Sequence, residues 1–186
     1  MRKQNKNGGG SQTNVNGLLF ERETSLEYAI ETMYGFAVEN GIVYKNGTMV
    51  GMICAKMNLY VSLLKPMGVD YKKILSKKLL PDEAFYNFIT NTIYIFEKKF
   101  QMSPGSVDEK LQTCDFKKRQ YEKLFSSLDI KVEYIYILND WFLKKEKEYR
   151  DVYDYIQQVG CKYFFENVPV EEIGLGMTKC HTSITP

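Results

Sequence analysis

The sequence has little excess charge of either sign. In 186 residues, 25 Lys and Arg stand against 23 Asp and Glu, a formal net charge of +2. A large basic excess is the usual electrostatic mark of a nucleic-acid-binding protein, so the total by itself argues weakly against that class. No apolar run approaches the roughly 20 residues that cross a bilayer, which predicts no membrane partner. The first residues contain no apolar core, so we expect no secretory signal.

Cysteine and histidine are also scarce. The four cysteines, at positions 54, 114, 161 and 180, form no CxxC pair, and the single histidine is His181. Zinc sites and CxxC redox motifs therefore lack their usual ligands. We expect reduced and mostly buried thiols, as in a cytoplasmic protein.

What is present is the composition of an ordinary globular domain, with 44% apolar, 26% charged and 14% aromatic residues. These fractions exclude collagen-like, disordered and coiled-coil chains. The length suits one domain with its own core. We expect a single domain over residues 1–186, with a flexible polar arm at about 1–16 and a tail at about 174–186.

Hydrophobic periodicity predicts helices and strands in a mixed order. The expected elements are a helix from Leu18 to about Val38, a hairpin of strands 42–44 and 49–54, a basic helical stretch 56–78, a hairpin of strands 84–89 and 92–100, a helix 108–128, a strand 132–138, a helix 146–159 and a strand 162–165. The almost continuous apolar run 132–138 is typical of a strand buried on both faces. It follows a helix, which implies a right-handed parallel crossover. The fold class is therefore α/β, a mixed sheet flanked by helices.

Charged side chains gather at the end of the second predicted hairpin. The side chains expected on one face of its second strand are Ile93, Ile95, Glu97, Lys99 and Gln101. A turn centred near residues 89 and 90 places Asp82 opposite Glu97, with Cβ atoms about 5 Å apart. Two carboxylates and an ammonium group then converge at one end of the sheet.

This cluster suits a hard divalent cation. Mg²⁺ needs only one or two protein carboxylates, and without a cation Asp82 and Glu97 would repel each other. Lys99 can orient a water or offset charge on a phosphoryl transition state. The alternative is a solvated Glu-x-Lys pair after a Pro-Asp turn. The combination of Pro-Asp, hairpin register, Glu-x-Lys and the following helix and parallel strand favours the metal site.

The pattern Pro81-Asp82 followed by Glu97-Lys98-Lys99 resembles the PD-(D/E)XK nuclease superfamily. The segments IFEKKFQ, GSVDEKLQT and FKKRQYEKLF resemble type II restriction endonucleases, and the resemblance covers roughly residues 17–138. It implies an α-β-β-β-α-β restriction-endonuclease-like core. It also implies a Mg²⁺-dependent, sequence-specific endodeoxyribonuclease with one or two Mg²⁺ ions per active site. Double-stranded DNA is the implied substrate, within a restriction-modification system, and the implied assembly is a homodimer in a prokaryotic cytoplasm.

The resemblance also implies roles for single residues. Asp82 and Glu97 correspond to metal ligands, the backbone carbonyl of Lys98 to a further ligand, and Lys99 to the catalytic lysine. Glu21 resembles a glutamate that many members add near the metal, although a Glu near a helix start also suits the helix dipole.

Gln101 resembles the Gln found two positions after the lysine in some relatives, where it would contact phosphate or water. The alternative is an exposed glutamine at a strand end.

Two further regions are expected to contact DNA. The start of helix 108–128 offers free N–H groups to an anion and carries a basic run that a solvated face would also explain. The polar arm offers amides that can read base edges, although a disordered N-terminus has the same composition. The residues expected to contact DNA are Ser11, Gln12, Asn14, Asn16, Ser106, Lys110, Lys117, Lys118 and Arg119.

Three other interpretations of the sequence remain open. The same fold could serve a repair or junction-resolving nuclease, or a non-catalytic DNA-binding module. The intact set of Asp82, Glu97 and Lys99 speaks against the module. An α/β protein with an accidental motif is the remaining alternative.

Overall fold

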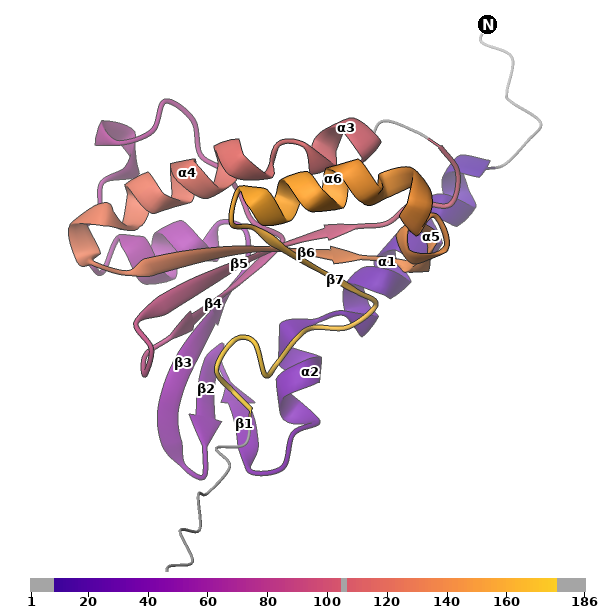
Figure 1. The fold of residues 1–186 in the computed structure, drawn as a ribbon. Coiled ribbons are helices and arrows are strands. Elements are labelled where there is room, and N and C mark those ends of the chain that lie inside the picture. Colours follow the sequence, from indigo (N-terminus) through magenta and orange to yellow (C-terminus); the bar gives the residue numbers. More distant parts are fainter. Residues whose placement is uncertain (1–8, 105–106, 177–186) are drawn as a thin grey trace, which may run out of the picture.

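The computed structural model describes residues 9–104 and 107–176, with side chains from Val15 onward in the first helix. A single seven-stranded sheet runs through the molecule, with the strands side by side in chain order (Figure 1). Its strands are β1 Phe36–Glu39, β2 Ile42–Lys45, β3 Thr48–Cys54, β4 Glu83–Asn87, β5 Thr92–Lys99, β6 Lys131–Leu138 and β7 Lys162–Phe165. Neighbours from β1 to β5 are antiparallel, whereas β5, β6 and β7 are parallel. The mixed sheet of an α/β protein is therefore confirmed.

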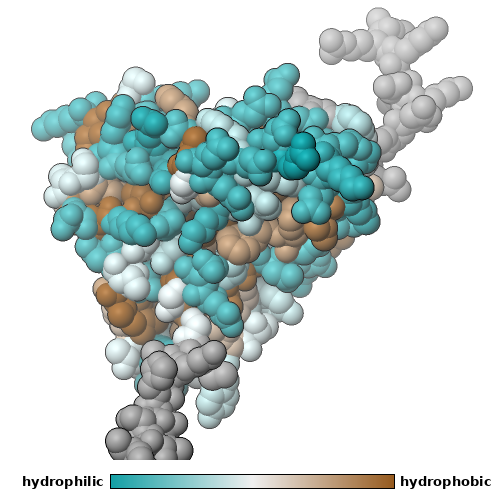
Figure 2. Space-filling model, in the orientation of Figure 1, coloured by the Kyte–Doolittle hydropathy of each residue, from teal (hydrophilic) through white to brown (hydrophobic). Residues whose placement is uncertain are grey.

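Helices cover both faces of the sheet (Figure 1). They are α1 Gly9–Glu23, α2 Leu26–Glu31, α3 Val107–Leu111, α4 Cys114–Phe125, α5 Asp140–Lys144 and α6 Glu146–Gln158, with single turns η1 Leu59–Leu64, η2 Tyr71–Lys73 and η3 Ser126–Leu128. One cluster of buried side chains joins η1, α4 and α6 to the face of β5 that carries Ile93 and Ile95, which we call the site face. A second cluster joins α1 and α2 to the opposite face, through Tyr94 and Phe96. The outer surfaces of α4 and α6 are mainly hydrophilic (Figure 2).

Strands β5 and β6 form the centre of the molecule. The β6 residues from Tyr134 to Leu138 are buried, and β5 is buried from Thr92 to Glu97. The predictions of a strand buried on both faces and of a parallel crossover are both confirmed, with Lys99 beside Leu138 at the carboxyl ends. A helix layer on each face excludes water from this pair, which explains the apolar runs in the sequence.

The predicted helix from Leu18 to about Val38 is wrong in extent. Helix α1 ends at Glu23, where the hydroxyl of Thr24 donates a 2.6 Å hydrogen bond to the Phe20 carbonyl. After α2, residues Phe36–Glu39 form strand β1, paired with β2 across Asn40 and Gly41. Both turn residues have positive φ, 51° and 80°, as a tight hairpin turn requires. A four-residue strand contains too few alternations to stand out against the helical spacing that precedes it.

Other boundaries also differ from the sequence-based expectation. Helix α1 begins at Gly9, so residues 9–16 of the expected arm lie in a helix. The stretch 56–78 contains only the π-helical turn η1 and the 3-10 turn η2, because Pro66 and Gly68 end the helical run. The helix expected at 108–128 is divided into α3, α4 and η3. Arm residues 1–8 and tail residues 177–186 lie outside the described part, whereas Leu175 of the expected tail is buried.

Among residues 9–104 and 107–176, no helix is long and apolar enough to cross a membrane.

Candidate metal and catalytic site

The register of the hairpin β4–β5 brings Asp82 and Glu97 side by side. Glu83 pairs with Phe96, so the preceding and following residues, Asp82 and Glu97, are the next neighbours on the two strands. The expected register is confirmed, although the loop spans residues 88–91 rather than a two-residue turn. The side chain of Asn87 fixes this loop by accepting hydrogen bonds from two backbone N–H groups within it. An Asx-type turn of this kind determines which residues meet at the far end of the hairpin.

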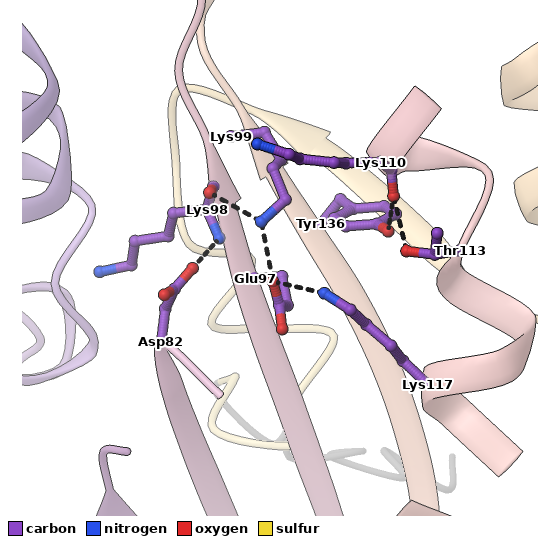
Figure 3. A network of polar contacts seen from close by, with 8 residues as sticks. All are labelled: Asp82, Glu97, Lys98, Lys99, Lys110, Thr113, Lys117 and Tyr136. Atoms are coloured by element: carbon purple, nitrogen blue, oxygen red, sulfur yellow. Dashed lines mark hydrogen bonds and ion pairs between the residues drawn. The ribbon is translucent and has the colours of Figure 1, made fainter. Parts of the chain in front are cut away.

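Asp82 is held by the neighbouring strand. Its Oδ2 atom accepts a 2.7 Å hydrogen bond from the backbone N–H of Lys98 (Figure 3). The preceding Pro81 is buried, and its carbonyl accepts from the N–H of Lys56 at 3.0 Å. The carboxylate is therefore held through Oδ2 and the backbone before it through Pro81, while within the described residues Oδ1 of Asp82 accepts no hydrogen bond.

Glu97 lies between two ammonium groups. Its Oε2 atom is 2.7 Å from Nζ of Lys99 and 3.1 Å from Nζ of Lys117, which comes from α4 (Figure 3). The residue is only 7% exposed. A carboxylate at that depth needs compensating charge, and two cations supply it here.

Lys99 is oriented by three groups. Besides Glu97, its Nζ donates to the Lys98 carbonyl at 3.3 Å and lies 5.9 Å from the centre of the Tyr136 ring. The phenol of Tyr136 donates a 3.0 Å hydrogen bond to the carbonyl of Lys110, which ties α3 to β6. Burial raises the pKa of Tyr136 well above its ordinary value, so the phenol remains a neutral donor at physiological pH.

The side chain of Lys98 points to the opposite face of the sheet. Its Nζ is 2.6 Å from Oε2 of Glu83 and donates to the backbone carbonyl of Glu21 at 3.0 Å. Glu83 in turn accepts from the N–H of Leu26, at the start of α2. Burial raises the pKa of Glu83, and the Lys98 ammonium partly opposes that effect.

Glu21, expected as a metal ligand, contacts the Lys98 side chain through its backbone carbonyl, and its carboxylate has no contact with Glu97 or Lys99. Its side chain is exposed, and the carbonyl bonds to Lys98 on the face opposite Glu97 and Lys99. Alternation along β5 causes this separation, because consecutive side chains point to opposite faces.

Gln101 shares the site face with Lys99, as expected, but is only 4% exposed. Its backbone N–H and C=O are both bonded by the side chain of Asn139, at 3.0 and 2.9 Å. Its amide donates to Asp108 at 3.2 Å, and the phenol of Tyr149 donates to the same carboxylate. The interpretation as an exposed strand-end glutamine is wrong, because α3 and α6 cover this position.

The residues expected to contact DNA from α4 have different surroundings. Lys117 faces Glu97, whereas Lys118 donates to the Gly160 carbonyl at 2.9 Å. Arg119 is exposed and pairs with Asp115 at 2.8 Å. Lys110 is exposed on α3, close to the site in Figure 3. Of these four cations, only Lys117 therefore contacts a carboxylate of the candidate site.

The remaining expected DNA contacts lie toward the other face or outside the described part. Asn16 on α1 donates to the sulfur of Met102 at 3.4 Å. Ser106 lies outside the described residues, as do the side chains of Ser11, Gln12 and Asn14, whose backbone belongs to α1.

The donor set at the strand ends suits a hard cation. The carboxylates of Asp82 and Glu97 come from adjacent strands, and the Lys98 carbonyl accepts a hydrogen bond from Nζ of Lys99 beside them (Figure 3). Oxygen donors of this kind are the ligands of Mg²⁺, which keeps several waters and needs few carboxylates. In the described part of the chain, no group of three or more His, Cys, Asp or Glu side chains could hold a metal ion. Two carboxylates and a carbonyl are oxygen donors of the type that Mg²⁺ takes together with water, and they do not form an all-protein cage.

Sequence reasoning missed two contributors to this site. Tyr136 lies under Lys99, and Asn139 positions Gln101; both belong to β6 or directly follow it. The polar pair Asn139-Asp140, directly after a buried strand, could have indicated a contribution to the site. The carboxyl ends of parallel strands meet at one edge of the sheet, so residues that follow β6 lie near the end of β5.

No family model, curated protein or solved structure matches the chain.

Proposed function

We propose that the protein is a Mg²⁺-dependent endodeoxyribonuclease of the PD-(D/E)XK type that hydrolyses double-stranded DNA. The observation that carries the proposal is the register of β4 and β5. It aligns Asp82 with Glu97, and the alternation of β5 sets Lys99 on the same face, next to the parallel strand β6. An accidental Glu-x-Lys would not require a second carboxylate fixed by the neighbouring strand.

Each residue of the site would have a separate role in phosphodiester hydrolysis. Asp82, Glu97 and the Lys98 carbonyl would hold Mg²⁺, which would stabilise charge on the scissile phosphate and lower the pKa of a water. Lys99, already 2.7 Å from Glu97, would orient the attacking water by donating a hydrogen bond to its oxygen and would offset negative charge on the phosphate. Lys117 approaches the same carboxylate from α4 and would turn toward the phosphate, where a cation offsets developing negative charge.

We further propose that the enzyme cleaves at a specific DNA sequence and acts as a homodimer. A symmetric recognition sequence needs two active centres, and a twofold dimer supplies them. A type II restriction endonuclease has these properties, whereas a repair or junction-resolving nuclease would select substrate shape. The cleavage pattern separates the two.

The direct test is digestion of an unmethylated plasmid of known sequence with Mg²⁺ and, separately, with EDTA. Wild type should give discrete fragments only with Mg²⁺. Asp82→Asn and Lys99→Met should each lower the rate by about 100-fold or more, because each removes a group acting on the reacting phosphate. Glu133→Gln and Lys131→Gln are matched controls. They alter an ion pair at the start of β6, at the opposite end of the strand from Leu138, which lies beside Lys99.

Several outcomes would count against the proposal. Full activity in Lys99→Met would exclude the mechanism. Cleavage only of branched substrates would favour the junction-resolving nuclease. DNA binding without cleavage, and without Mg²⁺-linked heat in calorimetry, would favour a non-catalytic module.

A further inference from the structure

Positive charge is concentrated in the connection between β3 and β4. Residues 56–80, which we call the basic connection, contain six lysines and a single acid, Asp70. The lysines are Lys56, Lys65, Lys72, Lys73, Lys77 and Lys78. The formal charge of the basic connection is therefore +5, and the rest of the chain carries −3 of the total of +2. The nearly neutral total conceals one strongly basic segment.

Within the described part of the chain, these lysines form no ion pairs. Five of the six side chains are exposed, and none lies in a salt bridge with any carboxylate of residues 9–104 or 107–176. In contrast, Lys98, Lys99, Lys117 and Lys118 each pair with a glutamate. A cluster of like charges without counter-charges raises the local potential and attracts polyanions.

The basic connection is anchored to the rest of the protein by buried side chains and hydrogen bonds. Its residues Leu59, Leu63 and Leu64 are buried in the core of the site face. The phenol of Tyr60 donates to the Leu79 carbonyl at 2.7 Å and accepts from the Leu79 N–H at 3.1 Å. These contacts close the connection on itself, so its lysines are presented from a defined surface.

Three of the lysines surround one hollow. A cavity of about 510 Å³ is lined by Lys65, Lys72 and Lys78, with the rings of Tyr60 and Tyr71 and with Asp70 as its one acid. The Lys78 Nζ lies 4.5 Å from the centre of one ring and 5.2 Å from the other, which holds the ammonium in place. Three lysines around a concave surface suit the binding of one discrete anionic group, such as a phosphate, better than lysines on a flat surface would.

The two ends of the basic connection meet beside Asp82. The N–H of Lys56 donates to the Pro81 carbonyl at 3.0 Å, one residue before the carboxylate of the candidate metal site. We propose that the basic connection is the docking surface for backbone phosphates of DNA, with one phosphate in the cavity lined by Lys65, Lys72 and Lys78. This inference rests on the proposed nuclease function, because continuity with Asp82 is what favours DNA.

The competing partner is an anionic lipid surface. Met57, Val61, Met67 and Leu80 are exposed in the same segment and could enter a membrane interface together with the lysines. The concave arrangement of Lys65, Lys72 and Lys78 and the contact with Pro81 favour DNA, because neither serves a flat bilayer.

The test measures binding without cleavage. In the Asp82→Asn background, fluorescence anisotropy follows a labelled duplex of arbitrary sequence between about 50 and 300 mM salt, the range in which counterion release dominates. The test variant is Lys65→Gln/Lys72→Gln/Lys77→Gln, three exposed lysines of the basic connection. The control is Lys123→Gln/Lys131→Gln/Lys147→Gln, which removes the same charge from exposed positions elsewhere.

The test variant should bind about tenfold or more weakly, and its salt slope should fall by up to about 0.9 for each phosphate that is no longer neutralised. The control should keep the parental slope. Equal slopes in the two triple variants would overturn the inference, even if wild type cleaves DNA. Weaker binding of the test variant to phosphatidylserine vesicles, with DNA binding intact, would assign the surface to lipid. If wild type does not cleave DNA but the salt slope of DNA binding still falls in the test variant, the nuclease proposal is refuted and the DNA-docking surface is retained.

Discussion

The backbone N–H of Lys98 donates a 2.7 Å hydrogen bond to the carboxylate of Asp82, just beyond Glu83 and Phe96, the last paired residues of β4 and β5. This bond extends the hairpin by one residue through a side chain. It sets the Asp82 carboxylate against the strand that carries Glu97 and Lys99 (Figure 3).

Removal of that acceptor should destabilise the protein. Asp82→Ala leaves the partly buried N–H of Lys98 without its partner, and we expect the free energy of unfolding to fall by about 1–2 kcal/mol. Urea denaturation measures the change. Asp154→Ala, at an exposed position of α6, is the control and should stay within about 0.5 kcal/mol. Equal effects of the two substitutions would show that the bond contributes nothing specific.

Lys117 should compete with a divalent cation for Glu97. In Lys117→Gln, Lys99 is the remaining cationic partner of Glu97 Oε2 among the described residues, so Ca²⁺ or Mg²⁺ should bind about two- to fivefold more tightly by calorimetry. Lys118→Gln is the neighbouring control, because Lys118 pairs with Glu122 instead. Weaker binding in Lys117→Gln would mean that Glu97 is not a cation ligand.

Glu83 should make stability depend on pH. Its pKa in the folded state is raised above the ordinary 4.5, mainly by burial, so between the two values the folded protein binds more protons than the unfolded chain. The contribution of this group is therefore present below 4.5 and is lost as the pH rises through the folded-state pKa. The free energy of unfolding of wild type, relative to Glu83→Gln, should fall as the pH rises above about 4.5. A difference that rises over this range would contradict the assignment.

Two buried tyrosines should respond differently to loss of the hydroxyl. The Tyr121 hydroxyl has no hydrogen-bond partner among the described residues, so Tyr121→Phe should leave the free energy of unfolding unchanged or raise it by up to about 1 kcal/mol. The Tyr153 hydroxyl donates to the Phe142 carbonyl at 3.0 Å, so Tyr153→Phe should lower it by about 1 kcal/mol. Thermal and urea denaturation of the pair provide the measurement. A loss in Tyr121→Phe as large as that in Tyr153→Phe would contradict the comparison.

Local sequence signals were sufficient for the sheet around the site. The apolar alternation from Ile93 to Lys99 and the apolar run of β6 are properties of consecutive residues, so strand identity, parallel pairing and hairpin register could be predicted. The strand Phe36–Glu39 could not, because four residues hold too little pattern to compete with the helical spacing before them.

The sequence by itself determined that Asp82, Glu97 and Lys99 lie together, because a two-residue period and one turn position specify which side chains share a face. Only the tertiary structure decided what surrounds them. It brought Lys117 from α4 to Glu97, buried Gln101 under α3 and α6, and left the carboxylate of Glu21 exposed beyond the other face. Contacts of this kind depend on how helices pack across a sheet, and no local period in the chain encodes that packing.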